Sequence, residues 1–143
     1  MKKLILSVIT CLMFLFTYAQ NDDASVYQIY QSEFYTYDSQ TERWNLETQN
    51  KNVNISMVFY KDAINIQART PTLFKIKMES KKPIRGNGYY GFSFDALECV
   101  DGKACKVDYV YLENDKNAFM LSISFKDGVL GKVNLRYYST INN

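Results

Sequence analysis

Histidine is absent from this sequence of 143 residues. Its absence excludes Ser-His-Asp and Cys-His hydrolase mechanisms, zinc sites that use histidine ligands, and acid–base catalysis by imidazole. Cysteine is scarce as well: there are three, and Cys11 lies in the N-terminal apolar segment. The remaining pair, Cys99 and Cys105, has no further cysteine or histidine with which to complete a structural zinc site. We therefore expect no metal and no cofactor.

A strong charge of either sign is also missing. The whole chain carries a formal charge of +2, and Lys2 and Lys3 near its N-terminus supply that excess. Without these two lysines, the acidic and basic residues are equal in number, at 15 each. Domains that bind nucleic acid usually present a strong positive field. We therefore expect no nucleic-acid partner.

The longest apolar run is at the N-terminus, where Lys2 and Lys3 precede residues 4–15. Thr17 and Ala19 place small residues where a signal peptidase reads the chain. The run is shorter than the roughly 18 to 20 apolar residues that span a bilayer comfortably, so residues 1–19 are predicted to be a cleavable signal peptide rather than an uncleaved anchor. Residues 20–143 then form a single β domain. We expect it in the periplasm or secreted, in a Gram-negative bacterium, and not in the membrane.

The two cysteines of this domain flank a turn sequence, with Asp101 and Gly102 between them. An even number of cysteines in an exported domain is most simply a disulfide. We therefore predict a bridge between Cys99 and Cys105, on adjacent strands and opposite each other, which would contribute about 2 kcal/mol. A metal pair or a nucleophile pair is the competing interpretation.

Apolar and polar residues alternate from Trp44 to Tyr137, a pattern typical of strands that bury one face. Short turns rich in Asn, Asp, Gly and Lys separate the runs. The fold class is therefore all-β: an antiparallel up-and-down meander of about eight or nine strands, closing into a small barrel, with a two-layer β-sandwich as the alternative. The aromatic residues expected to face inward are Trp44, Phe59, Phe74, Tyr90, Phe92, Phe94, Tyr109, Tyr111, Phe119, Phe125 and Tyr137.

The start of the domain has a different pattern. Val26, Ile29, Tyr30 and Phe34 fall at helical spacing. The sequence therefore predicts a short N-terminal helix that leads into a first strand.

The inward aromatic volume is large for a barrel of this size, whose interior side chains alone can fill. We expect a mostly filled core with the tyrosine hydroxyls gathered at one open end, because a buried unpaired hydroxyl costs about 1 to 3 kcal/mol. Any ligand would then bind in a shallow pocket at that mouth, in contact with Tyr90, Tyr109 or Tyr111. A cavity above about 300 Å³ would instead indicate a lipocalin-like carrier.

The strand at Trp44, the successive hairpin rows and the turn from Asp101 to Cys105 resemble those of small bacterial periplasmic or secreted β-proteins of unknown function. In size and layout the domain also resembles lipocalin-type and avidin-type barrels, although the Gly-x-Trp signature of lipocalins is missing. This resemblance implies a small meander barrel and identifies no functional residue.

The expected function is a non-enzymatic exported binding or interaction protein that contacts a small apolar ligand, a glycan or a protein partner. The alternative is a carbohydrate-active hydrolase that uses a carboxylate pair, with its acids among Asp95, Glu98, Asp108 and Glu113. These acids lie on polar strand faces or in turns, where carboxylates are normally solvated. A buried carboxylate pair in a cleft would favour the enzyme, and an apolar cavity would favour the binding protein.

Overall fold

The computed structural model describes residues 24–140, apart from the side chain of Lys116. The predicted signal peptide, residues 1–19, lies outside the described residues. These described residues form eight strands: β1 (Ser25–Asp38), β2 (Arg43–Phe59), β3 (Ala63–Gln67), β4 (Thr72–Gly86), β5 (Tyr89–Glu98), β6 (Ala104–Leu112), β7 (Asp115–Asp127) and β8 (Gly131–Thr140).

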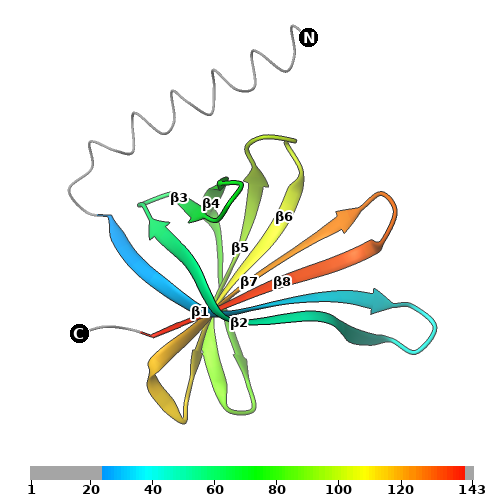
Figure 1. Cartoon of the computed structure of the whole chain (residues 1–143), viewed down its shortest axis with the longest axis horizontal. Coiled ribbons are helices and arrows are strands. Elements are labelled where there is room, and N and C mark those ends of the chain that lie inside the picture. Colours follow the sequence, from blue (N-terminus) through cyan, green and yellow to red (C-terminus); the bar gives the residue numbers. More distant parts are fainter. Residues whose placement is uncertain (1–23, 141–143) are drawn as a thin grey trace, which may run out of the picture.

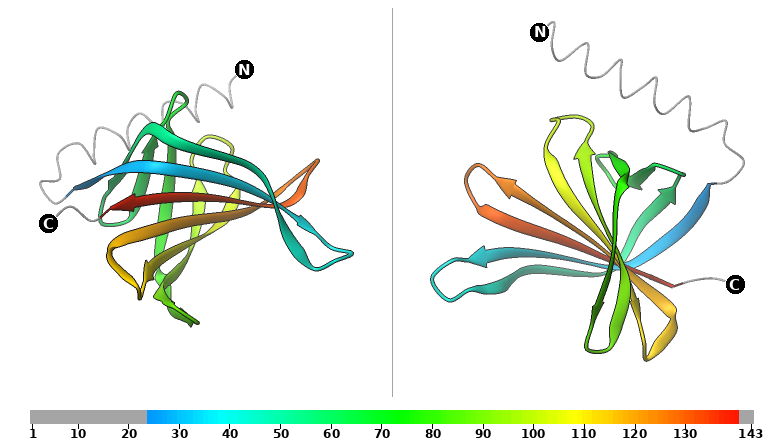
Figure 2. Two further views of the ribbon diagram at one scale, coloured as in Figure 1. Left: turned by 60° about the horizontal axis from the view of Figure 1, so that its bottom comes forward. Right: turned by 180° about the vertical axis from the view of Figure 1, so that it is seen from behind.

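Each strand pairs with the next in antiparallel register, and β1 also pairs with β8, so the sheet closes into a barrel. The expected up-and-down meander is therefore confirmed. The strands are strongly twisted, and their hairpins project outward in different directions (Figures 1 and 2). In this topology the β3–β4, β5–β6 and β7–β8 turns lie at one end of the barrel, and the β2–β3, β4–β5 and β6–β7 turns lie at the other.

The predicted N-terminal helix is wrong, because residues 25–38 form β1. The register of β1 is irregular at Tyr30, which is an extra, bulged residue of β1 against β8, whereas against β2 the extra residues lie on β2, between Lys51 and Ile55. Ile29 is buried in the core before the bulge, and Phe34 lies opposite Leu135 after it. One extra residue between two alternating runs produces an apolar spacing that resembles a helix turn. No helix long and apolar enough to cross a membrane is present in residues 24–140.

The middle of the barrel is solid. Its most deeply buried large side chains come from four strands that face one another across the interior: Ile29, Met57, Val107, Phe119, Leu121 and Ile123, each at most 1 % exposed. All six belong to one apolar core cluster. The alternating pattern therefore predicted these core residues correctly. The two apolar pockets described below lie at the ends of the barrel.

The β1–β2 hairpin extends beyond the barrel (Figure 2), which corrects one expectation. Trp44 is 38 % exposed rather than inward. It lies opposite Tyr37 in the hairpin, with the two rings in edge contact at 5.2 Å between centroids. Because the paired strands run past the rim, this part of the hairpin has no barrel interior to face.

Candidate functional site

An apolar pocket lies at the barrel end that carries the β3–β4 and β5–β6 turns. It has a volume of about 310 Å³, and we call it the Cys105 pocket; its lining residues are Thr70, Pro71, Thr72, Phe74, Glu98, Val100, Asp101, Lys103, Cys105, Phe125, Leu135 and Tyr137. The pocket expected beside Tyr90, Tyr109 and Tyr111 is a different one, at the opposite end of the barrel, and is described below. The volume of the Cys105 pocket reaches the size at which ligand pockets begin, about 300 Å³.

Strand register explains how the wall of this pocket is built. Cys105 lies opposite Phe125, and Leu135 follows Val133 by two residues on β8, so both keep the inward orientation of the core rows. Phe74 on β4 is 4 % exposed and belongs to the same core cluster. The inner wall of the pocket is therefore formed by fixed, packed strands, and the outer wall by turns.

Tyr137 supplies a polar group inside this apolar wall. Burial raises the pKa of its hydroxyl above the usual value for tyrosine, so the group stays protonated. Among residues 24–140 no side chain or backbone group forms a hydrogen bond with this hydroxyl, and no fully buried polar side-chain atom is left unsatisfied. The Tyr137 hydroxyl is therefore open to the pocket, where a ligand or a water molecule must satisfy it.

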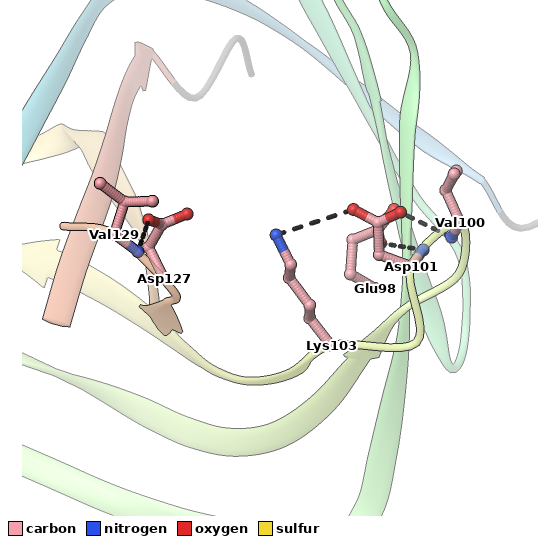
Figure 3. A network of polar contacts seen from close by, with 6 residues as sticks. All are labelled: Glu98, Val100, Asp101, Lys103, Asp127 and Val129. Atoms are coloured by element: carbon pink, nitrogen blue, oxygen red, sulfur yellow. Dashed lines mark hydrogen bonds and ion pairs between the residues drawn. The ribbon is translucent and has the colours of Figure 1, made fainter. Parts of the chain in front are cut away.

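The rim of the Cys105 pocket is acidic. Figure 3 shows Lys103 between Asp101 on the β5–β6 turn and Asp127 at the end of β7, with its Nζ 3.7 Å from Asp101 Oδ2. Glu98 accepts hydrogen bonds from the backbone amides of Val100 (3.0 Å) and Asp101 (2.6 Å), which fixes the turn.

Asp127 closes its own turn in the same way. Its Oδ1 accepts hydrogen bonds from the amides of Val129 (2.8 Å) and Leu130 (2.9 Å). The Leu130 and Val129 amides, and to a smaller degree the charge of Lys103, lower the pKa of Asp127. Glu98, Asp101 and Asp127 thus bring three carboxylates to this mouth, where Lys103 is the ammonium group that lines the pocket.

A second pocket, of about 230 Å³, lies at the opposite end of the barrel. We call it the aromatic pocket; it is lined by Phe59, Tyr60, Lys61, Ile64, Ile76, Met78, Phe92, Phe94, Tyr109 and Tyr111. Two of the three predicted ligand-contact residues, Tyr109 and Tyr111, line it. Tyr90 stacks on Tyr111 with 5.4 Å between ring centroids, but it is 49 % exposed and does not line the pocket. Burial raises the pKa of Tyr109 and of Tyr111, so both hydroxyls stay protonated.

The structure contains no disulfide between Cys99 and Cys105. Register is the reason: Cys105 lies opposite Ala96, not opposite Cys99. Cys105 belongs to the interior core, whereas Cys99 packs with Leu73 in a small separate cluster and donates its amide hydrogen to the Leu73 carbonyl. The predicted arrangement of two cysteines facing each other is therefore wrong. Burial raises the pKa of the Cys105 thiol to about 11.

The four acids named for the hydrolase alternative are spread over the outside of the barrel and its turns. Asp108 accepts a hydrogen bond from Ser93 at 2.5 Å, Glu113 pairs with Arg85 at 3.3 Å, and Asp95 is exposed. Glu98 belongs to the rim of the Cys105 pocket, whereas Asp108 lines a separate hollow with Tyr89 and Arg136, so no two of these acids share a pocket described here.

A different acid, Glu33, is buried, at 7 % exposed, on the outer side of β1. It accepts hydrogen bonds from four side chains: Gln31 (2.7 Å), Tyr35 (2.7 Å), Gln49 (2.8 Å) and Tyr138 (2.8 Å). Burial by itself raises the pKa of Glu33, but these hydrogen bonds outweigh it, and the net pKa is lowered. A carboxylate held ionised in this way is suited to join β1, β2 and β8 rather than to donate a proton. Sequence patterns gave no sign of this cluster, because its members come together only through strand pairing.

The sequence pattern predicts that Phe74, Phe125 and Tyr137 face inward and fill the core. In the structure they line the Cys105 pocket. Alternation shows which face a residue is on, and it does not show which strand ends share a mouth. No group of three or more His, Cys, Asp or Glu residues in the described part of the chain is arranged to hold a metal ion. No protein-family model, curated protein or solved structure matches this chain.

Proposed function

We propose that this chain is a non-enzymatic exported binding protein that holds a small, mainly apolar molecule in the Cys105 pocket. The observation that carries the proposal is an apolar pocket of about 310 Å³ with the hydroxyl of Tyr137 open to it. Ligand pockets commonly combine a mostly apolar wall with a few polar groups that orient the ligand. Export to the periplasm or the exterior remains part of the proposal and is supported by the signal-like residues 1–19.

The charge of the rim restricts the ligand further. The lining contains two carboxylates, Glu98 and Asp101, against the single ammonium group of Lys103, and Asp127 lies close to Lys103, so the mouth carries an excess of negative charge. An anionic head group would be repelled there, whereas a hydroxyl, a carbonyl or an amine would be accepted. The proposed ligand is therefore a neutral or cationic amphipathic molecule with one polar end.

The closed barrel of eight antiparallel strands supports the same proposal. Barrels of this size either fill their interior with side chains or hold one small ligand, as lipocalins and streptavidin do. This chain does both: its middle is packed, and its ends are hollow. A lipocalin-like or avidin-like layout is proposed on this basis, and a bacterial origin is proposed only from the resemblance to bacterial exported β-proteins.

The test is a titration of the ¹⁵N-labelled mature chain with 1-octanol, followed by amide chemical shifts. With nine non-hydrogen atoms, 1-octanol should bind with a Kd of roughly 0.5 mM. Tyr137→Phe removes one hydrogen bond and should weaken binding about threefold. Tyr111→Phe, the same change at the opposite end, is the matched control and should leave the affinity unchanged.

Two further arms address the pocket and its charge. Leu135→Trp should fill the pocket and abolish the octanol response, provided that its ligand-free spectrum retains the dispersion of a folded barrel. Octanoate should bind several-fold more weakly than 1-octanol, because it brings a carboxylate to an acidic rim. Equal affinities of the parent and Tyr137→Phe, together with a response that survives Leu135→Trp, would show that this pocket is not the binding site.

A further inference from the structure

The aromatic pocket has a composition unlike that of the Cys105 pocket. Six of its ten lining residues carry aromatic rings: Phe59, Tyr60, Phe92, Phe94, Tyr109 and Tyr111. The floor is aliphatic and closed, with Ile64 at 3 % and Ile76 at 8 % exposed. Ring faces and ring edges attract other rings in offset-stacked or edge-to-face geometry. The lining therefore favours a ligand that presents a flat ring.

Ring packing around this pocket fixes its walls. Phe59 meets Tyr109 edge-on, with 4.9 Å between centroids and an interplanar angle of 67°. Tyr109 also stacks on the core residue Phe119 at 5.3 Å, and Tyr111 lies 5.9 Å from Tyr109. Because the rings support one another, the pocket is preformed. Its volume of about 230 Å³ suits one aromatic ring with a small substituent, since an apolar cavity of about 150 Å³ can hold benzene.

The mouth of this pocket is basic. Lys61 lines it, and the Nζ of Lys81 lies 4.0 Å from the centroid of the Phe92 ring, which also lines it. Within residues 24–140 neither lysine forms an ion pair with a carboxylate. The nearby carboxylates Asp62 and Glu79 line an adjoining groove.

That groove shares Ile76 and Met78 with the aromatic pocket, and it also contains Lys75 and Lys77. Its two carboxylates are therefore accompanied by two ammonium groups of their own. The charge left for a ligand at the aromatic mouth is positive, opposite in sign to the rim of the Cys105 pocket.

We propose that the aromatic pocket is a second binding site, which takes a small planar aromatic anion: its ring enters between Phe59, Tyr109 and Tyr111, and its acidic group lies beside Lys61 and Lys81. The two pockets lie at opposite ends of a packed core. This site therefore goes beyond the proposed function, and the two can fail separately.

Three small probes separate the contributions of ring and charge in an NMR titration of the ¹⁵N-labelled mature chain. Benzoate has both the ring and the negative charge, benzylamine has the ring with a positive charge, and cyclohexanecarboxylate has the charge without an aromatic ring. Benzoate should bind saturably and shift the amides of Ile64, Tyr109 and Tyr111. Its affinity should exceed that of each other probe by about fivefold.

Variants in exposed side chains complete the test without endangering the fold. Lys81→Gln should weaken benzoate about threefold and leave benzylamine unchanged or slightly tighter. Phe92→Leu should reduce the preference for benzoate over cyclohexanecarboxylate. Lys103→Gln, the matched charge removal at the opposite end, should have no effect on benzoate.

Several results would overturn the inference. Benzylamine binding as tightly as benzoate would refute the assigned charge, and cyclohexanecarboxylate binding as tightly would refute the role of the rings. Benzoate shifts centred on Cys105 and Leu135, or the absence of saturable shifts, would refute the site itself. The octanol titration of the Cys105 pocket is independent of each of these outcomes.

Discussion

Gly91 provides a sharp test of how closely β5 and β6 approach each other. It lies in β5 opposite Val110 of β6. A Cβ atom added at Gly91 would lie 1.7 Å from the carbonyl oxygen of Tyr109 and 3.1 Å from the Cα of Val110. Both neighbours are backbone atoms, so a rotamer change cannot relieve the contact. Gly91→Ala must therefore push the two strands apart beside Tyr109, which lines the aromatic pocket.

The expected loss follows from two opposing effects. Overpacking a well-packed site costs about 1 to 3 kcal/mol, and occasionally more; a clash with backbone belongs at the upper end. Alanine also restricts the unfolded chain, which returns about 0.4 to 1 kcal/mol. We therefore expect the free energy of unfolding of Gly91→Ala to fall by about 2 kcal/mol or more.

Equilibrium unfolding in urea measures this loss directly, as a lower midpoint with an unchanged slope. Gly128→Ala is the matched control, since a Cβ at Gly128 would have no atom within 4 Å. That variant should change the free energy of unfolding by less than about 0.5 kcal/mol. If Gly91→Ala proved as mild as the control, the close approach of β5 and β6 would be refuted.

Two further predictions concern the two cysteines and the buried carboxylate of Glu33. Alkylation of the denatured protein without reductant should label both Cys99 and Cys105. In the native protein Cys105 should be protected from alkylation, because its side chain is buried and its pKa is raised to about 11. A peptide bridged through both cysteines in a non-reducing map would contradict the strand register. Glu33→Gln should lower the free energy of unfolding at pH 7 by about 1 to 3 kcal/mol. The pKa of Glu33 is lowered in the fold, so its contribution to the free energy of unfolding is complete above the unfolded pKa of about 4.3 and is lost as the pH falls through the folded pKa. Urea titrations at several pH values should show that Glu33→Gln lacks this loss of stability in acid. An unchanged pH dependence would contradict the hydrogen-bonded carboxylate.

The meander was predictable because most strands bury one face along their central stretch. Residues such as Val107, Leu121 and Ile123 alternate with polar neighbours, and each is fully buried in the barrel. Period-two alternation reports the burial of one face, and short turns force consecutive strands to pair. The order of the strands follows from these two facts, whereas their number was predicted only as eight or nine.

Features that depend on register were not predictable. The bulge at Tyr30 changes the phase of β1 and imitates a helical pattern. Cys99 and Cys105 flank one turn, yet the pairing of Ala96 with Cys105 places the two cysteines in different clusters. A shift of one residue moves a side chain to the other face of the sheet, and the sequence contains no direct record of such shifts.

The candidate sites were predictable in kind but not in position. Tyr109 and Tyr111 do line a pocket, as inward aromatic residues near strand ends should. The Cys105 pocket combines Phe74, Phe125 and Tyr137 from three strands with residues of two turns. Recognising it requires knowing which strand ends meet at one mouth, and that depends on the closure of β1 against β8.

The most direct test of the binding proposal is to locate 1-octanol on the mature protein in solution. Intermolecular nuclear Overhauser effects from ¹³C-labelled octanol report protons within about 5 Å of the bound chain. We expect contacts from its methyl end to Phe74, Cys105 and Leu135, with its hydroxyl end beside Tyr137. Contacts confined to Tyr109 and Tyr111, or no intermolecular contacts at saturating octanol, would contradict the assignment of the Cys105 pocket as the ligand site.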